Sequence, residues 1–221
     1  MSKVESAVIP TLQITSSWQL VLKWIGASAI AVPLAVLLHE VGHLLAYLTF
    51  GFQGAALHYS SATYTLEKMF WQTVYRGNLA AATSMIPAWK VGVATAAGIS
   101  ITCVVTILCC LFVAKKGPHP LAVALGIFSP VRFLSGIPTL LVWFSGKPVR
   151  TGTDEAHLAA LTGIPVVLLI FAGLLFLLLT WIWLVRSIPK RQRWVSLGSL
   201  FTGLVVGIFV YFWLIGPSLL P

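Results

Sequence analysis

Five long apolar runs constrain this chain more than any other feature of its sequence. We place them at residues 24–50, 91–114, 121–144, 165–185 and 195–215. Each is long enough to cross a hydrocarbon core of about 30 Å as a helix. The chain is 58% hydrophobic and 9% charged, which leaves no long polar stretch for a soluble domain. The sequence therefore predicts a polytopic α-helical membrane protein whose 221 residues form one membrane-embedded domain.

The basic residues lie beside these apolar runs. The formal charge is +9 at pH 7, and Lys115 and Lys116 follow one run while Arg186, Lys190 and Arg191 follow another. Such flanking charges set membrane orientation, so we expect a lipid bilayer as partner and no nucleic acid. Their distribution mildly favours a cytoplasmic N-terminus. Residues 1–18 are polar and mixed, so we expect the first run to stay as a signal anchor.

The segment after the first run has no helical pattern. Residues 51–66 contain glycines, tyrosines and β-branched residues, which predict a short membrane-associated β segment. Residues 68–76 are expected to be interfacial, with their aromatic side chains at headgroup level. In the third run, Pro130 and Pro138 predict a kink. The spacing of Gly203 and Gly207 in the fifth run predicts close packing within the protein.

The end of the first run carries HEVGH at residues 39–43. His39 and His43 are four residues apart, so both imidazoles lie on one helical face and can reach one metal ion. Glu40 can reach a metal-bound water without being a ligand. Two imidazoles and a carboxylate suit Zn²⁺, which activates water, and Glu40 could take the proton as the water attacks a carbonyl. The pattern therefore predicts a zinc site with Glu40 as general base.

The third ligand must come from elsewhere in the chain. Helical rise from Trp24 places His39 about 22 Å into the membrane. The loop between the third and fourth runs returns to that side and carries GTDEAHLAALTGIP at residues 152–165. Asp154 or Glu155 could therefore meet the histidines. The alternative is that Asp154 is only a helix N-cap with Glu155 in the first turn.

Two further polar residues bear on this site. Arg132 lies in the third run, where a guanidinium must face a cavity or pair with an acid. We expect an ion pair with Glu40 or Asp154, with stabilisation of an oxyanion as the second possibility. His157, three residues after Asp154, is spaced to substitute as a ligand. Without a metal, the histidines would be neutral and hydrogen-bonded to neighbouring helices, with Glu40 paired to Arg132.

These segments together resemble the site-2 protease family of intramembrane zinc metalloproteases. The resemblance rests on HEVGH late in a first apolar run, the extended GFQGAALHYSSATYT at residues 51–65 directly after it, and an aspartate far downstream. TDEAHLAALTGIP at residues 153–165 is similar in placement to the version in the family's small members without PDZ or other accessory domains. Two positions depart from the family pattern: Glu155 replaces a glycine after the aspartate, and Ile99 replaces a proline after Ala-Gly.

The resemblance implies a zinc metalloendopeptidase in which His39, His43 and Asp154 hold Zn²⁺ and Glu40 is the catalytic base. It also implies a transmembrane protein substrate, whose unwound backbone would lie extended beside residues 51–65. Family members with the motif in the first span usually open their site toward the cytosol. That expectation opposes the charge distribution, so the orientation stays open.

Other functions share parts of this pattern. Integral-membrane CAAX-type proteases and their stress-response relatives also use HExxH, with a glutamate as third ligand, a role that only Glu155 could fill here. A non-proteolytic metal-binding or transport protein could use the histidines and Asp154 as a transit site and would not need Glu40. A degenerate scaffold that binds membrane partners without cutting them is a third alternative.

Overall fold

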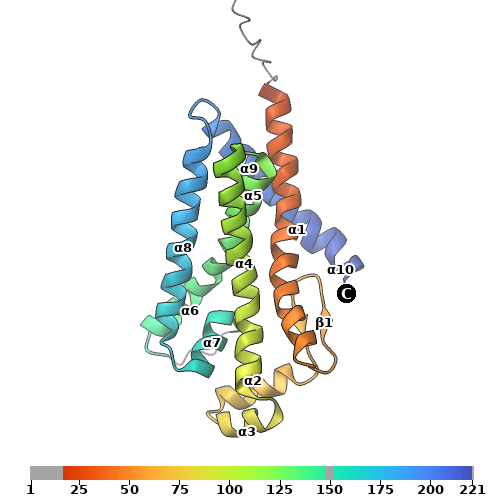
Figure 1. Cartoon of the computed structure of the whole chain (residues 1–221), viewed down its shortest axis with the longest axis vertical. Coiled ribbons are helices and arrows are strands. Elements are labelled where there is room, and N and C mark those ends of the chain that lie inside the picture. Colours follow the sequence, from red (N-terminus) through yellow and green to blue (C-terminus); the bar gives the residue numbers. More distant parts are fainter. Residues whose placement is uncertain (1–16, 148–151, 221) are drawn as a thin grey trace, which may run out of the picture.

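The protein is a polytopic helical membrane protein. Its described part contains five helical segments that are long and apolar enough to cross a bilayer. The computed structural model describes residues 17–147 and 152–220. The spans are α1 (Ser17–Thr49), α4 (Ala88–Lys116), α5 (Pro120–Phe128) with α6 (Gly136–Phe144), α8 (Val166–Ser187) and α9 (Arg193–Phe209) with its continuation. All five expected spans are present; α1, α4 and α8 run along the long axis, and α9 crosses α1 obliquely (Figure 1). The stretch before α1, where we expect no cleavable signal, lies outside the described residues.

The predicted kink in the third span is a break in the α-helix. A 3-10 helix, η1 (Ser129–Ser135), joins α5 to α6 and contains Pro130 and Arg132. Pro138 lies in the first turn of α6, where a missing N–H removes no helical bond. The last span changes similarly, because a π-helical segment, η2 (Val210–Ile215), connects α9 to the short α10 (Gly216–Leu219).

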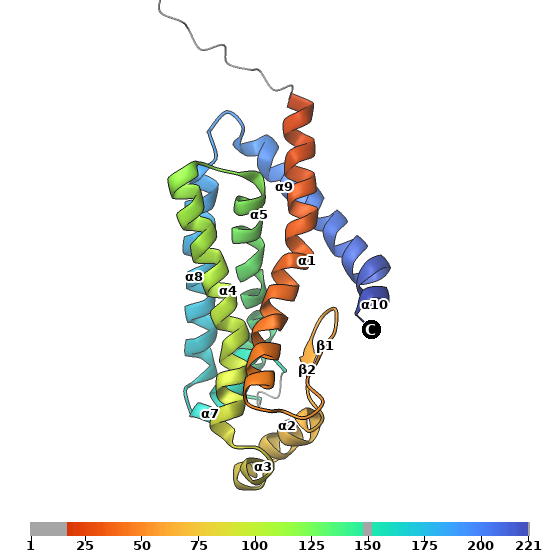
Figure 2. The same cartoon turned by 45° about the vertical axis from the view of Figure 1, so that its right-hand side comes forward.

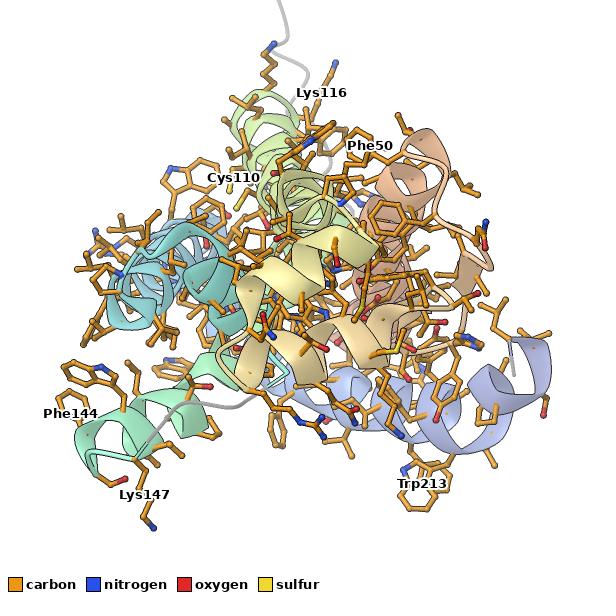
Figure 3. All side chains as sticks on the ribbon, turned by 90° about the horizontal axis from the view of Figure 1, so that it is seen from below. Phe50, Cys110, Lys116, Phe144, Lys147 and Trp213 are labelled. Atoms are coloured by element: carbon orange, nitrogen blue, oxygen red, sulfur yellow. The ribbon has the colours of Figure 1, made fainter. Side chains whose placement is uncertain are left out.

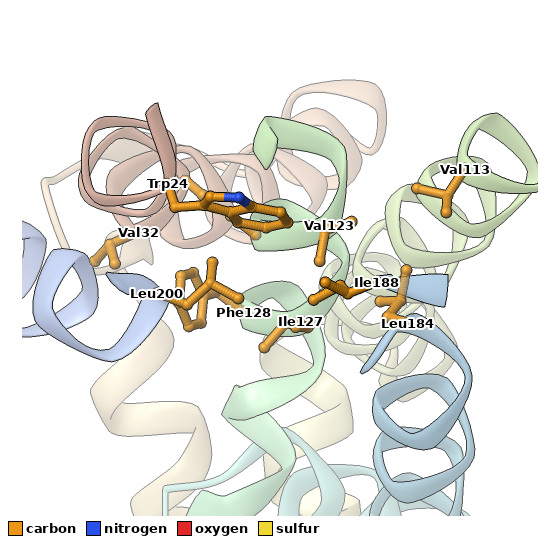
Figure 4. Packing of buried hydrophobic residues seen from close by; sticks show 11 residues of the cluster. Trp24, Val32, Val113, Val123, Ile127, Phe128, Leu184, Ile188 and Leu200 are labelled. Carbon is orange, nitrogen blue, oxygen red and sulfur yellow. The ribbon is translucent and has the colours of Figure 1, made fainter. Parts of the chain in front are cut away.

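Helix α1 is the central element of the bundle, packing against α4, α5 and α9. Gly203 and Gly207 permit the α9 contact, since a Cβ there would lie 2.4 Å from Ile25 O and 2.8 Å from Ala29 O. The two glycines therefore serve packing within the chain, as expected. An apolar cluster lies at the end of the bundle far from HEVGH. It contains Trp24, Val123, Phe128, Leu184 and Leu200 (Figure 4).

A small β-hairpin follows α1. Strands β1 (Ala56–Leu57) and β2 (Ala62–Thr63) pair antiparallel, with Ala56 opposite Thr63 and Leu57 opposite Ala62. The hairpin lies between the lower half of α1 and the C-terminal segment (Figure 2). Tyr59 at its tip is fixed there, because its N–H donates to Leu220 O and its carbonyl accepts a hydrogen bond from Tyr211 Oη.

Two short helices, α2 (Glu67–Tyr75) and α3 (Leu79–Met85), cross the end of the bundle next to the hairpin (Figure 3). The aromatics of α2 were expected at headgroup level, but Phe70 and Trp71 are 0% and 8% exposed and pack into the protein. The amphipathic helix turns these rings inward and leaves Met69 exposed. A third short helix, α7 (Asp154–Thr162), lies at this end and packs against α4 and α8.

Candidate metal centre

His39 and His43 lie one turn apart on α1 and are both buried, with 9% and 4% of their surface exposed. Their Nε2 atoms are 3.1 Å apart. Both rings turn toward α4, which provides a hydrogen-bond partner for each Nδ1. His39 Nδ1 is 3.0 Å from Thr102 Oγ1, and His43 Nδ1 is 2.8 Å from the carbonyl oxygen of Ala94.

The Ala94 carbonyl determines the tautomer of His43. A carbonyl only accepts, so His43 Nδ1 carries the proton and its Nε2 presents a lone pair. Histidines that bind metals characteristically donate their other N–H to such a partner. The sequence contains a signal for this support, because Thr95, Thr102 and Thr106 form a buried polar stripe on one face of an apolar helix.

Glycines at the crossing of α1 and α4 bring the imidazoles to this support. A Cβ at Gly42 would lie 2.8 Å from Ala97 O, and one at Gly98 would lie 2.3 Å from His43 Nε2 and 2.7 Å from His39 Cε1. Such separations are too short for real Cβ contacts, so both positions require glycine for this close approach. Gly42 within HEVGH and Gly98 in the Ala-Gly pair are therefore part of the site's construction.

Asp154 reaches the two histidines from α7. The alternative that Asp154 is only the N-cap is wrong, because Thr153 is the N-cap and its Oγ1 accepts a hydrogen bond from Ala156 N. The first-turn carboxylate of Asp154 is thereby free to turn inward. Its Oδ2 lies 3.2 Å from His39 Nε2 and 3.3 Å from His43 Nε2.

These three atoms have the spacing that a metal ion requires. The separations of 3.1, 3.2 and 3.3 Å compare with about 3.3 Å between ligands of a tetrahedral ion bound at about 2.0–2.1 Å. Three donor-type atoms at these separations can act as ligands of one ion. The group formed by His39, His43 and Asp154 could therefore hold a metal ion.

Arg132 supplies positive charge beside this group. Its Nη1 contacts Asp154 Oδ2 and His39 Nε2, and its Nη2 lies 3.4 Å from Glu155 Oε1. Burial alone would raise the pKa of Asp154, but the Arg132 guanidinium and the two imidazoles hold that pKa well below its usual range. A metal ion at these ligand atoms would require Nη1 to withdraw, and Glu155 offers the guanidinium a second carboxylate.

Glu155 points away from the histidines. It is 2% exposed, its Oε1 faces Arg132, and its Oε2 has no hydrogen-bond partner among the described residues. Burial raises the pKa of Glu155, and Arg132 opposes that shift. Of the two acids proposed from the sequence, the structure therefore brings Asp154, and not Glu155, to the imidazoles.

Glu40 lies on the same turn of α1 as His39 but faces the hairpin. Its Oε2 accepts a hydrogen bond of 2.8 Å from the backbone N–H of Ala62 in β2. Of the partners expected for Arg132, the structure thus selects Asp154, while Glu40 contacts the strand. Glu40, the histidines and Asp154 all line one cavity of about 350 Å³.

We call this cavity the polar chamber. Besides the site residues it is lined by Tyr47, Ser61, Tyr64, Glu67, Trp71 and His157. His157, the histidine spaced to replace a ligand, instead stacks on Trp71 with ring centroids 3.8 Å apart and planes at 7°. Burial raises the pKa of Glu67 to about 6. The chamber therefore gathers ionisable and hydroxyl groups around the candidate metal centre.

Comparison of the chain with protein families, with curated proteins and with solved structures finds no match.

Proposed function

We propose that the protein is an intramembrane zinc metalloprotease that hydrolyses peptide bonds of membrane-spanning substrates, as its resemblance to the site-2 protease family implies. The observation that carries the proposal is the convergence of His39 Nε2, His43 Nε2 and Asp154 Oδ2 within 3.3 Å of one another. Two imidazoles and a carboxylate are a ligand set found in catalytic zinc sites, which leave one position open. Glu40 adjoins this group in the same chamber.

Zinc, when bound, lowers the pKa of a coordinated water to about 7 and polarises a carbonyl. The chain supplies the proton transfers. The Glu40 carboxylate accepts a proton as water attacks the substrate carbonyl, and returns it to the amine that leaves. The Ala62 N–H holds Oε2 and so leaves Oε1 as the oxygen for this transfer. The polar chamber provides the path for water.

The hairpin supports the choice of an extended peptide as substrate. Along a strand, the N–H and C=O of one residue point to the same side. The N–H of Ala62 points to Glu40, so the outer edge of β2 faces the site. A substrate helix hides its carbonyls in its own hydrogen bonds, and an unwound segment could pair with this edge. Pairing would present a carbonyl beside Glu40.

The first test is zinc content per chain in detergent-purified protein. We expect about one zinc in the wild type, as for a single three-ligand site. The variants His43→Ala and Asp154→Ala should lose the zinc. Their helical content and thermal unfolding temperature should stay close to those of the wild type. A folded wild type that binds no zinc even on reconstitution would refute the metal site.

The second test separates proteolysis from metal binding or transport. Wild type and Glu40→Gln are incubated with synthetic membrane-spanning peptides, and products are identified by mass spectrometry. We expect equal zinc content but a loss of about 10²–10⁴-fold in cleavage rate in Glu40→Gln, the usual contribution of a general base. Zinc in both proteins with no cleavage that depends on Glu40 would favour the binding or transport function.

The hairpin has a test of its own. Replacing residues 57–65 by a flexible polar linker should abolish cleavage and leave zinc bound, because this segment supplies no ligand. Unchanged cleavage would exclude the strand edge as the substrate's binding site.

A further inference from the structure

A second cavity adjoins the site. It has a volume of about 260 Å³ and shares His39, Glu40 and Arg132 with the polar chamber. The rest of its wall is mostly apolar and includes Val32, Val36, Val131, Leu204, Ile208 and Phe212. We call this cavity the apolar chamber. Glu40 therefore stands between a polar and an apolar space.

The size and lining of the apolar chamber indicate its occupant. Pockets for whole small molecules span about 300–1,000 Å³, so this cavity fits a part of a ligand. Its wall comes from α1, the end of α5, η1 and the α9–η2 segment, all within the membrane-spanning region. Among the described residues, no charged side chain lines it beyond the shared site residues. A large aliphatic or aromatic side chain meets these conditions.

A peptide extended along β2 would bring such a side chain to the chamber. Successive side chains of an extended chain point to opposite faces, so a residue next to the carbonyl at Glu40 can turn away from the polar chamber. We infer that the apolar chamber is a specificity pocket, which selects a large apolar side chain beside the cleaved bond. This inference rests on the proposed proteolytic function and names the feature of the substrate that the site recognises.

The outer wall of the chamber is connected to the hairpin. Phe212 lies in the π-helical η2, a type of segment that often occurs at functional sites. The preceding residue, Tyr211, donates its hydroxyl to Tyr59 O at the hairpin tip, at 2.5 Å. Tyr211 thus connects the hairpin to the helix that carries Phe212 of the chamber wall. This arrangement fits one substrate that engages both.

The experiment compares the cleavage specificity of wild type, Leu204→Phe and Ile208→Ala. The probe is a mixture of synthetic membrane-spanning peptides of varied apolar sequence, with Glu40→Gln as blank and cut sites read by mass spectrometry. In the wild type we expect Leu, Phe, Ile or Met at one fixed position relative to the cut. Leu204→Phe should lower kcat/KM for these peptides about tenfold or more and favour Ala at that position. Ile208→Ala should shift preference toward larger side chains.

Val205→Phe is the matched control. Val205 lies on the same helix but is 52% exposed and does not line the chamber, so its cleavage profile should equal that of wild type. Zinc content and thermal unfolding of each variant show that the site is intact.

Cleavage with no preferred position, or with a preference unchanged in both Leu204→Phe and Ile208→Ala, would overturn the pocket and leave the proteolytic function standing. No cleavage that depends on Glu40 would overturn both. A lipid that co-purifies with the wild type and is displaced by Leu204→Phe, without a change in specificity, would assign the chamber to an acyl chain instead.

Discussion

Gly98 lies against both imidazoles of the candidate metal centre, where a single methyl group would meet His43 Nε2 and His39 Cε1. Its place on α4 lets α1 approach until Thr102 and the Ala94 carbonyl reach the two Nδ1 atoms. The histidines are thus oriented by a neighbouring helix as well as by their own rotamers. Orientation of this kind strengthens metal binding because less conformational freedom is lost when the ion binds.

We expect Gly98→Ala to weaken zinc binding by about tenfold or more, the effect of losing a supporting residue. The added Cβ would lie 2.3 Å from His43 Nε2, so the ring must move. Gly92→Ala on the same helix is the control, because its Cβ would have only Leu161 Cδ1 nearby, at 3.8 Å. Competition with a chromogenic chelator measures the affinity. Equal affinities in the two variants would show that the close helix crossing does not hold the imidazoles.

Asp154 and Glu155 are adjacent but have different surroundings, which gives a second prediction. Asp154→Asn removes a proposed ligand and should lower zinc affinity by well over about 100-fold, whereas Glu155→Gln removes a partner of Arg132 and should lower it about tenfold. The same chelator competition measures both. The reverse order would make Glu155 the ligand and support a CAAX-type protease.

At the scale of elements, the short helices α2 and α7 close the end of the polar chamber. Trp71 of α2 and His157 of α7 join them by a parallel ring stack with 3.8 Å between centroids. Burial lowers the pKa of His157 to about 4 from an ordinary value of 6.5. The neutral imidazole is therefore the form compatible with this contact.

The stack should weaken on acidification. Between pH 6.5 and about 4 the unfolded chain binds a proton at His157 that the folded chain does not, so stability falls as the pH falls. The loss is at most about 1.4 kcal/mol per pH unit within this window, and water in the chamber reduces it. His157→Phe keeps an aromatic ring there and should remove this part of the pH dependence. Thermal unfolding in detergent from pH 7.5 to 4 tests it; parallel curves for both proteins would contradict the shift.

At the scale of the whole molecule, the two ends differ in character. One end has the loop from α8 to α9 and the basic residues Lys115, Lys116, Arg186, Lys190, Arg191 and Arg193. The other has the hairpin, α2, α3 and α7 around the polar chamber. Because each of these helices is long enough to cross the bilayer, the two ends of the bundle lie on its opposite sides. Water and metal should therefore reach the site from one side only.

Labelling in sealed vesicles of uniform orientation tests this arrangement. The three native cysteines are first replaced. A single cysteine is then introduced by Ser84→Cys in α3 or by Lys190→Cys before α9, and each variant is treated with a membrane-impermeant maleimide. We expect each to react from one side only, and from opposite sides. Zinc should be removed by an impermeant chelator only from the side that labels Ser84→Cys. Labelling of both positions from the same side would contradict the topology.

Much of this fold follows from local sequence. A bilayer leaves the backbone few alternatives to a helix, so long apolar runs predicted all five spans. Helical periodicity likewise placed His39 and His43 on one face, and the proline in η1 predicted the break of the third span. The direction of α2 was missed, because the same aromatic residues suit either a headgroup layer or a protein interior. Only neighbouring elements decide between these two environments.

The sequence by itself determined the spans and the paired histidines, since both depend on contacts within a few residues along one helix. The tertiary structure decided which acid joins them. Asp154 and Glu155 share the first turn of α7 and differ by one residue, about 100° around a helix, so the way α7 packs selects between them. The partner of Arg132 and the support of the imidazoles by α4 depend likewise on helices far apart in the chain. Their approach is set by glycines whose importance is visible only where two helices cross.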